Sequence, residues 1–421
     1  MIKTFVEIFQ NKDIRKKILF TLLMLFVYRL GTAIVVPGIN TSSINLSGNS
    51  LLNMMSLLGG GAISHMSIFA LGVGPYITAS IIIQLLSMDI IPYLTDLTKE
   101  GKKGQREIDK ITRYAGVVMA LVQSFFIVQT LQAQYKIIEN PGFTSYLYVA
   151  IIFTAGTMFL LWIGDQITTK GIGNGVSIII FAGIVSDMPF TFSTVFKGLT
   201  GTDAGMLKFI IYLIMYLVII ILVTAMQLGQ RKIPIQYTSS SVQSRSKGDM
   251  NYLPLKINSA SVIPVIFASA LIQAPQIILS WVNQGLYQKW ANILSFDKPY
   301  ILVFYGVLII VFTFFYTNMQ VDPAKIAEDF NKQNTYIPGI RPGRETEEYV
   351  SKVLNRITVL GALALTAIAL IPYIVTNLTG MNMRAAIGGT GIIIVVGIAM
   401  ETYKQLVGQL TQKAYKGFIG K

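Results

Sequence analysis

Long apolar stretches recur along the whole chain, and they constrain its fold more than any other feature. The hydrocarbon core of a bilayer is about 30 Å thick, so a helix of roughly 20 apolar residues crosses it once. Ten such runs are present, over residues 18–36, 68–91, 111–134, 146–168, 176–196, 207–228, 260–282, 299–319, 353–375 and 387–403. With 53% hydrophobic and only 13% charged residues, the sequence predicts an all-α membrane protein with ten transmembrane helices.

The positions of Lys and Arg predict the orientation of these helices. Loops that stay in the cytoplasm retain Lys and Arg. With the N-terminus inside, 27 of the 34 basic residues fall on the cytoplasmic side and six on the other, while Arg29 lies within the first run. We therefore expect both termini in the cytoplasm. The net charge of +14 has this topological explanation, and a binding role for particular loops stays open beside it.

Two of the predicted cytoplasmic loops, residues 229–257 and 320–352, are longer than a connection requires. The later loop mixes both signs of charge, which favours a folded segment that faces a partner. In the earlier loop, turn-forming residues 238–241 follow Ile233 and Ile235, a pattern typical of a β-hairpin.

Charged side chains within apolar runs separate a channel from an ion-coupled transporter. Transporters with inverted repeats hold ionisable groups near the middle of the bilayer, because a charge is costly there and is kept for a purpose. Asp165, Arg356 and Glu401 lie near the ends of runs, where their head groups reach the interface. Arg29 is the exception, and we expect it to pair with a helix-terminal carbonyl or a neighbouring helix. The spans are thus expected to hold no buried carboxylate, which argues against the transporter.

Catalytic motifs are missing from the sequence. It has no cysteine, a single histidine (His65), no phosphate-binding glycine-rich loop, no HExxH zinc motif and no GxSxG nucleophile. We expect no enzyme activity, catalytic residue, metal site or cofactor.

Glycine and proline interrupt two of the runs. Gly72, Gly74 and Pro75 lie inside the second run, where a proline breaks or kinks a helix. Such a break is tolerated beside a cavity, and a simple packing kink is the alternative. A glycine-rich segment around Gly175 opens the fifth run and predicts close helix approach.

Aliphatic residues occupy helix faces that would be polar in a solute channel. Ile77 and Ile81 are four residues apart and share a helix face, as do Val176 and Ile180. This spacing is typical of packed core, and it also suits a constriction that gates by excluding water.

Five segments in order resemble landmarks of the SecY family, the central subunit of the bacterial Sec translocon. They are SIFALGVGPYITASIIIQLL at 67–86, LWIGDQITTKGIGNGVSIII at 161–180, GQRKIPIQY at 229–237, LPLKINSASVIPVIFASA at 253–270 and YIPGIRPGRETEEYV at 336–350. The resemblance covers essentially the whole chain. It implies a protein-conducting channel that translocates unfolded secretory polypeptides and releases membrane helices laterally into lipid.

The resemblance also implies an internal layout. Two five-helix halves, residues 1–200 and 201–421, are expected to form a pseudo-symmetric clamshell, with a plug at residues 51–65. The pore ring is expected at Ile77, Ile81, Val176, Ile180, Ile266 and Ile394, where isoleucine is more usual than valine at position 176. Gln84 and Asn258 are expected at a lateral gate between the second and seventh helices. Each has an alternative role in satisfying a neighbouring helix.

Partners follow from the same resemblance. Arg231, Lys232 and Arg341 are expected to dock the ribosome or the SecA motor ATPase, since basic side chains suit both ribosomal RNA and carboxylates. For Arg341 the alternative is an ion pair with Glu345, Glu347 or Glu348. SecE and SecG subunits, signal sequences, nascent polypeptides and membrane lipid complete the expected partners, in a bacterial plasma membrane. An accessory paralogue of the family with a restricted set of substrates remains an alternative.

Overall fold

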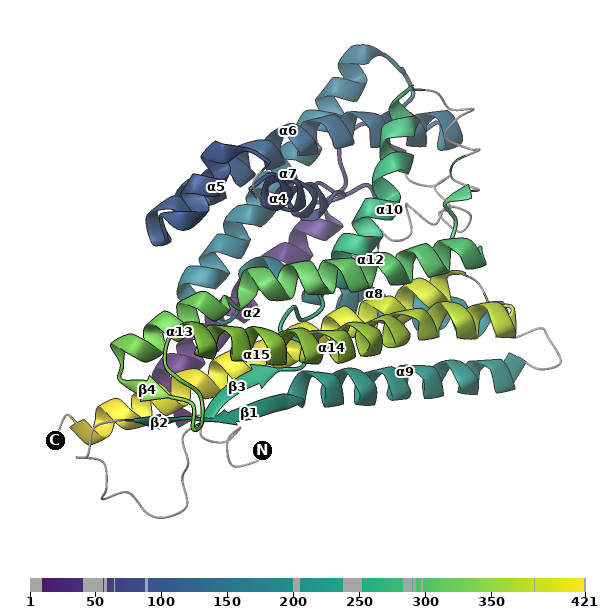
Figure 1. Ribbon diagram of the computed structural model, residues 1–421. Coiled ribbons are helices and arrows are strands. Elements are labelled where there is room, and N and C mark those ends of the chain that lie inside the picture. The colour runs from purple at the N-terminus through teal and green to yellow at the C-terminus, as the bar shows by residue number, and fades with distance from the viewer. Residues whose placement is uncertain are drawn as a thin grey trace.

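The computed structural model describes residues 10–40, 56, 59–63, 65–87, 90–199, 205–237, 252–282, 290, 293–296, 298–381 and 383–419. Each predicted apolar run corresponds to one helix (Figure 1). These helices are α2 (Lys12–Ala33), α4 (Gly74–Leu86), α6 (Lys102–Tyr135), α7 (Phe143–Lys170), α8 (Gly175–Leu199), α9 (Gly205–Leu228), α10 (Ile263–Val282), α12 (Pro299–Gln320), α14 (Arg344–Thr379) and α15 (Met383–Ile419).

The all-α membrane architecture is confirmed. In the part of the chain that the structure describes, seven helical segments are long and apolar enough to cross a membrane, while α4 and α10 contribute shorter apolar helices. Without water in the bilayer, backbone groups must bond within their own segment, which is why apolar runs of this length become helices. Ten crossings agree with this architecture, and the division into halves at residue 200 stays a prediction.

The helices are apolar on all sides, so sequence alone does not tell their inner face from their lipid face. On α9, Tyr212, Ile219 and Val223 are buried, whereas Ile214 and Ile221 are more than half exposed. A stripe of exposed apolar side chains this long is what a lipid-facing helix presents.

The N-terminus of α4 corrects one prediction. The sequence predicted a broken or kinked helix across residues 68–91, but residues 68–73 form turns and α4 begins at Gly74. Pro75 therefore lies in the first helical turn, where its missing N–H would have had no partner in the helix. The proline starts the helix, so it gives no support for a cavity beside a break.

Close approach between helices was predicted for the glycine-rich start of the fifth run, and it is confirmed. A Cβ at Gly175 would lie 1.8 Å from the carbonyl oxygen of Gly164 on α7. A Cβ at Gly156 of α7 would lie 1.9 Å from the carbonyl oxygen of Ile68. Small residues allow membrane helices to pack at this distance.

We expect Gly156→Ala to lower the stability of the folded protein by about 1–3 kcal/mol, because its methyl group has no space beside a fixed carbonyl. Gly408→Ala is the matched control, since Gly408 also lies within a helix and has no atom within 4 Å of its added Cβ. Thermal unfolding in detergent should show a lower Tm for the first variant only. Equal Tm values would contradict close packing at Gly156.

The two long loops fold together at one end of the helical bundle. β1 (Gln230–Pro234) pairs antiparallel with β3 (Tyr252–Lys256), and β2 (Gln236–Tyr237) pairs with β4 (Thr335–Tyr336) of the later loop. The later loop also contains α13 (Pro323–Lys332), whose first turn is capped by the Asp322 carboxylate. Ile233, Leu255, Ile337 and Val350 form a common apolar core. Folded loops were predicted and are present, while the predicted hairpin tip at 238–241 lies outside the described residues.

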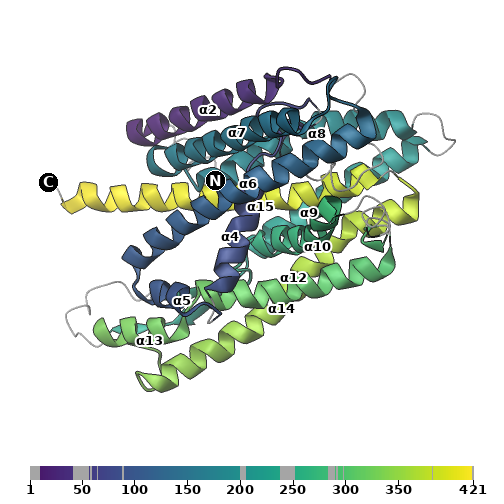
Figure 2. The ribbon, with the colours of Figure 1, turned by 90° about the horizontal axis from the view of Figure 1, so that it is seen from above.

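Segments that were assigned to the cytoplasmic side lie at the same end of the bundle. The strands, α13, α5 (Pro92–Lys99) and the C-terminal part of α15 all lie at the left in both ribbon views (Figures 1 and 2). The start of α2 joins them, because Lys17 Nζ donates to Gln409 Oε1 of α15 at 3.1 Å. This arrangement agrees with one common side for both termini and the long loops.

Candidate functional site

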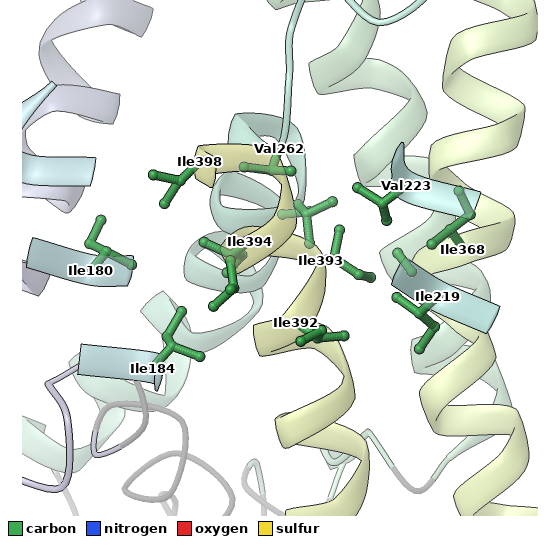
Figure 3. Close-up of a cluster of buried hydrophobic side chains, with 14 of the residues drawn as sticks. Ile180, Ile184, Ile219, Val223, Val262, Ile368, Ile392, Ile393, Ile394 and Ile398 are labelled. Atoms are coloured by element: carbon green, nitrogen blue, oxygen red, sulfur yellow. The ribbon is translucent and has the colours of Figure 1, made fainter. Parts of the chain in front are cut away.

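All six predicted ring residues, from α4, α8, α10 and α15, belong to or pack against the main apolar cluster of the bundle, which also includes residues of α2, α7, α9, α12 and α14. Ile81, Ile180 and Ile394 are 6%, 4% and 2% exposed. The other three, Ile77, Val176 and Ile266, are partly buried and pack against the same cluster. Figure 3 shows Ile394 on α15 between residues of α8 on one side and of α9 and α14 on the other.

The six predicted ring residues are aliphatic, although the wider cluster also contains tyrosine and phenylalanine. Aliphatic side chains offer water or an ion no hydrogen bond in place of hydration. The sequence pairs on α4 and α8 were compatible with core or with constriction, and their place in the main apolar cluster of the bundle agrees with both.

A tight turn at residues 59–61 lies against α2 and α8, at the end of the predicted plug. Most of the segment 51–65 lies outside the described residues, but Ser56 and residues 59–63 are described and buried. Tyr28 Oη donates to the Gly59 carbonyl at 3.2 Å.

Arg29 contacts a neighbouring helix, as one of its two predicted alternatives required, and the carbonyl that it meets belongs to a turn and not to a helix end. Its Nη1 donates to the Gly60 carbonyl at 3.2 Å, to Ser186 Oγ on α8 at 3.1 Å and to Thr32 Oγ1 at 3.4 Å. It therefore bonds both to a backbone carbonyl and to a neighbouring helix. The part played by Ser186 was missed, because a serine within an apolar run gives no sign of which helix it faces.

Asp187 corrects a second prediction. The spans were expected to hold no buried carboxylate, yet Asp187 on α8 is 6% exposed and its Oδ2 accepts from Thr191 Oγ1 at 2.9 Å. The expectation was therefore wrong. The signal was in the sequence, where an aspartate stands inside the run 176–196 two residues before Pro189. The carboxylate lies beside the 59–61 turn, since a Cβ on Gly61 would be 3.5 Å from Asp187 Oδ1.

The two predicted lateral-gate residues occupy separate settings. Gln84 on α4 donates from Nε2 to Ser80 Oγ at 3.3 Å, and its Oε1 is buried without a hydrogen-bond partner. Asn258 precedes α10 and donates from Nδ2 to the Ser261 carbonyl at 2.7 Å, leaving Oδ1 buried without a partner. Both amides are described, and no hydrogen bond joins them. The hydrogen bonds of Gln84 to Ser80 and of Asn258 to Ser261 stay within one segment. They therefore show neither the gate role nor the alternative role in satisfying a neighbouring helix.

Asn258 borders a polar cavity of about 260 Å³ among the ends of α9, α12 and α15 and the turn before α10. Lys404 Nζ donates to the Gln227 carbonyl there, and Gln227 Nε2 bonds to Ser261 Oγ at 3.3 Å. Ser261 has a φ of +57°, a conformation that costs energy for a residue with a side chain. The cavity wall thus joins α9 and α15 to the turn before α10 through polar contacts.

The predicted docking residues are exposed on the folded loops. Arg231 and Lys232 lie on β1, and Lys232 Nζ stands 4.5 Å from the centre of the Tyr252 ring. Arg341 is 87% exposed at its side chain, and its Nη1 is 3.8 Å from Glu345 Oε1. An ion pair this long and exposed contributes little to stability. Its predicted ion pair is therefore present but leaves the guanidinium open to a partner.

Comparisons with known proteins agree along the full length. The SecY family model matches residues 67–403. The chain is 43% identical over 434 residues to the protein translocase subunit SecY of Staphylococcus epidermidis, and 42% identical over 430 residues to that of Staphylococcus aureus, with 100% of both chains covered each time.

Solved structures share the fold at low sequence identity. A structure described as that of a protein conducting channel has a TM-score of 0.66 at 20% identity, covering 93% of this chain and 91% of that chain. Sec61 in a canine ribosome-channel complex has a TM-score of 0.63 at 19% identity, covering the same shares.

Proposed function

The chain belongs to the SecY family, and we infer that it is the channel subunit of a protein translocase, through which polypeptides cross a membrane. The observation that supports this function at particular residues is that six aliphatic side chains from α4, α8, α10 and α15 share one apolar cluster. We assign these six residues as the pore ring. It seals against ions when empty and yields to a polypeptide, because aliphatic side chains adapt their packing without losing hydrogen bonds.

Crosslinking of a stalled secretory chain tests the ring directly. A photoreactive residue at Ile81 or Ile266 should crosslink to the chain in membranes supplied with SecA and ATP, and the crosslink should depend on the signal sequence. The same probe at Ile214, which is 56% exposed on α9, should capture lipid instead. No crosslink at the ring, with efficient export by a control channel in the same assay, would contradict the assignment.

Residues 51–65 are the proposed plug, and α4 with α10 the proposed lateral gate for signal sequences and membrane helices. The burial of residues 59–63 supports the plug, since this part of the segment is packed into the helical bundle. Gln84 and Asn258 support the gate through amide oxygens that lack partners in this conformation. A buried unpaired acceptor costs free energy, so a rearrangement that supplies it with a donor is favoured.

The folded loops are the proposed docking surface for SecA and the ribosome. The two loops share an apolar core and a strand pair, and all three basic residues are exposed on them, which supports a common docking surface. The canine Sec61 structure is a complex with a ribosome. Phosphate contacts by such residues weaken steeply with salt, which separates an RNA partner from a protein partner.

The remaining proposals concern the membrane, the orientation and the companion subunits of the channel. We place it in a bacterial plasma membrane with both termini in the cytoplasm, without chemistry of its own, driven by its partners. SecE and SecG are the proposed companion subunits. An apolar groove of about 340 Å³ between α2, α8 and α15 suits a membrane helix of such a subunit.

A further inference from the structure

One guanidinium joins three parts of the molecule near the proposed plug. Arg29 belongs to α2, and its Nη1 donates both to the Gly60 carbonyl and to Ser186 Oγ of α8. The preceding residue, Tyr28, donates to the Gly59 carbonyl from the same helix. Two consecutive carbonyls of the turn are therefore held by two consecutive side chains of α2.

The backbone of the turn is shaped for this contact. Gly60 and Gly61 have φ values of +67° and +82°, in the left-handed region that favours glycine. A Cβ on Gly60 would lie 2.9 Å from Tyr28 Oη, 3.0 Å from Gly183 Cα and 3.0 Å from Ser186 Oγ. The turn thus approaches both helices so closely that an added side chain would have to displace its neighbours.

These hydrogen bonds depend on the position of the turn. A charged side chain inside an apolar helix needs partners, and so do buried carbonyls. Arg29 and the turn satisfy each other only while residues 59–61 lie against α2 and α8. When the turn leaves, Arg29 keeps its Ser186 and Thr32 contacts but loses the Gly60 carbonyl. The hydrogen bonds consequently stabilise the conformation in which the turn lies against α2 and α8. They shift the equilibrium away from the conformation in which the turn has left.

We propose that Tyr28, Arg29 and Ser186 form a latch that holds the 59–61 turn and keeps the channel closed until a substrate engages it. The proposal rests on the proposed function, in which residues 51–65 are the plug. Arg29 acts as a positioning residue, since it fixes the plug segment and touches neither substrate nor pore ring.

The test measures the resting ion leak of the purified channel complex in lipid vesicles, together with export of a substrate whose signal sequence is defective. Arg29→Ala should raise the leak about tenfold or more, because a hydrogen bond to a charged group is lost from the closed state alone. Arg29→Lys keeps the charge and a donor and should restore most of the seal. Ser186→Ala removes one contact of the guanidinium and should raise the leak by a smaller factor. This variant tests the proposal if Arg29→Ala fails to insert into the membrane.

A second variant perturbs the latch without removing a charged side chain. Gly60→Ala should raise the leak, because its methyl group displaces the turn from Tyr28 and Ser186. Gly38→Ala is the matched control, since Gly38 has a similar φ of +84° but no atom within 4 Å of its added Cβ. It carries the same backbone strain and should leave the seal intact.

The outcomes separate the latch from the channel. Wild-type leak in both Arg29→Ala and Gly60→Ala, with normal transport of an intact secretory substrate, would overturn the latch and leave the channel function standing. An equal leak in Gly38→Ala would also overturn it, because strain alone would then explain the effect. A wild-type complex that moves no polypeptide would count against the proposed function itself.

Discussion

Ile394→Asn should open the seal of the channel, with a raised resting ion leak and export of substrates that carry defective signal sequences. Ile394 is 2% exposed in the main apolar cluster and is one of the six residues that we assign as the pore ring. An amide there has no partner among the aliphatic neighbours and costs about 1–3 kcal/mol when it stays dry. The cost falls if water enters, so the substitution favours a hydrated, open constriction.

Ile394→Leu is the control, because it conserves volume and apolar character and should leave the seal close to that of the wild type. Ion flux into vesicles and export of a reporter with a crippled signal sequence give two independent readouts. If the asparagine variant has an unchanged leak and an unchanged substrate range, Ile394 is ordinary core and the ring assignment fails at α15.

Arg341→Glu should abolish SecA-dependent transport while the protein still folds and inserts. The side chain is 87% exposed and makes one long ion pair, so the fold does not depend on it. The substitution replaces a positive docking group by a carboxylate beside Glu345, and a carboxylate-bearing partner would then be repelled.

Arg344→Glu offers a matched control on the same loop. Arg344 is 89% exposed, and its Nε bonds to Glu348 Oε1 at 3.1 Å. Charge reversal there alters the field of the loop by the same amount without changing the proposed contact. ATP-driven translocation into membrane vesicles should be lost in the Arg341 variant and retained in the Arg344 variant. Normal transport by the Arg341 variant, or equal loss in both, would refute the specific role of Arg341.

The helical spans and their common sidedness could be read from the sequence, because both follow from local chemistry. Each apolar run must satisfy its own backbone in lipid, and basic residues mark the loops on one side. The ring residues were predicted through family resemblance, since spacing on one helix gives no indication of which other helix it meets. Their gathering from α4, α8, α10 and α15 is a long-range fact.

The wrong predictions concern residues whose structural role depends on their tertiary surroundings. Pro75 was predicted to interrupt a helix that in fact starts beside it, because a run of apolar residues does not distinguish helix from buried turn. Asp187 was overlooked as a buried carboxylate, since only packing shows that it lies inside next to the 59–61 turn. The pairing of β2 with β4 was not predicted either, because antiparallel strands about a hundred residues apart carry no local signal.

The sequence by itself determined that this chain is a bundle of membrane helices with basic loops on one side. Hydropathy and charge act residue by residue, so they need no knowledge of neighbours. Only the tertiary structure decided which aliphatic side chains are buried and which are exposed, as with buried Ile219 and exposed Ile221 on the same helix. It also decided that Arg29 meets the Gly60 carbonyl. In lipid, every apolar face is equally soluble, so the packing of helix against helix makes this choice.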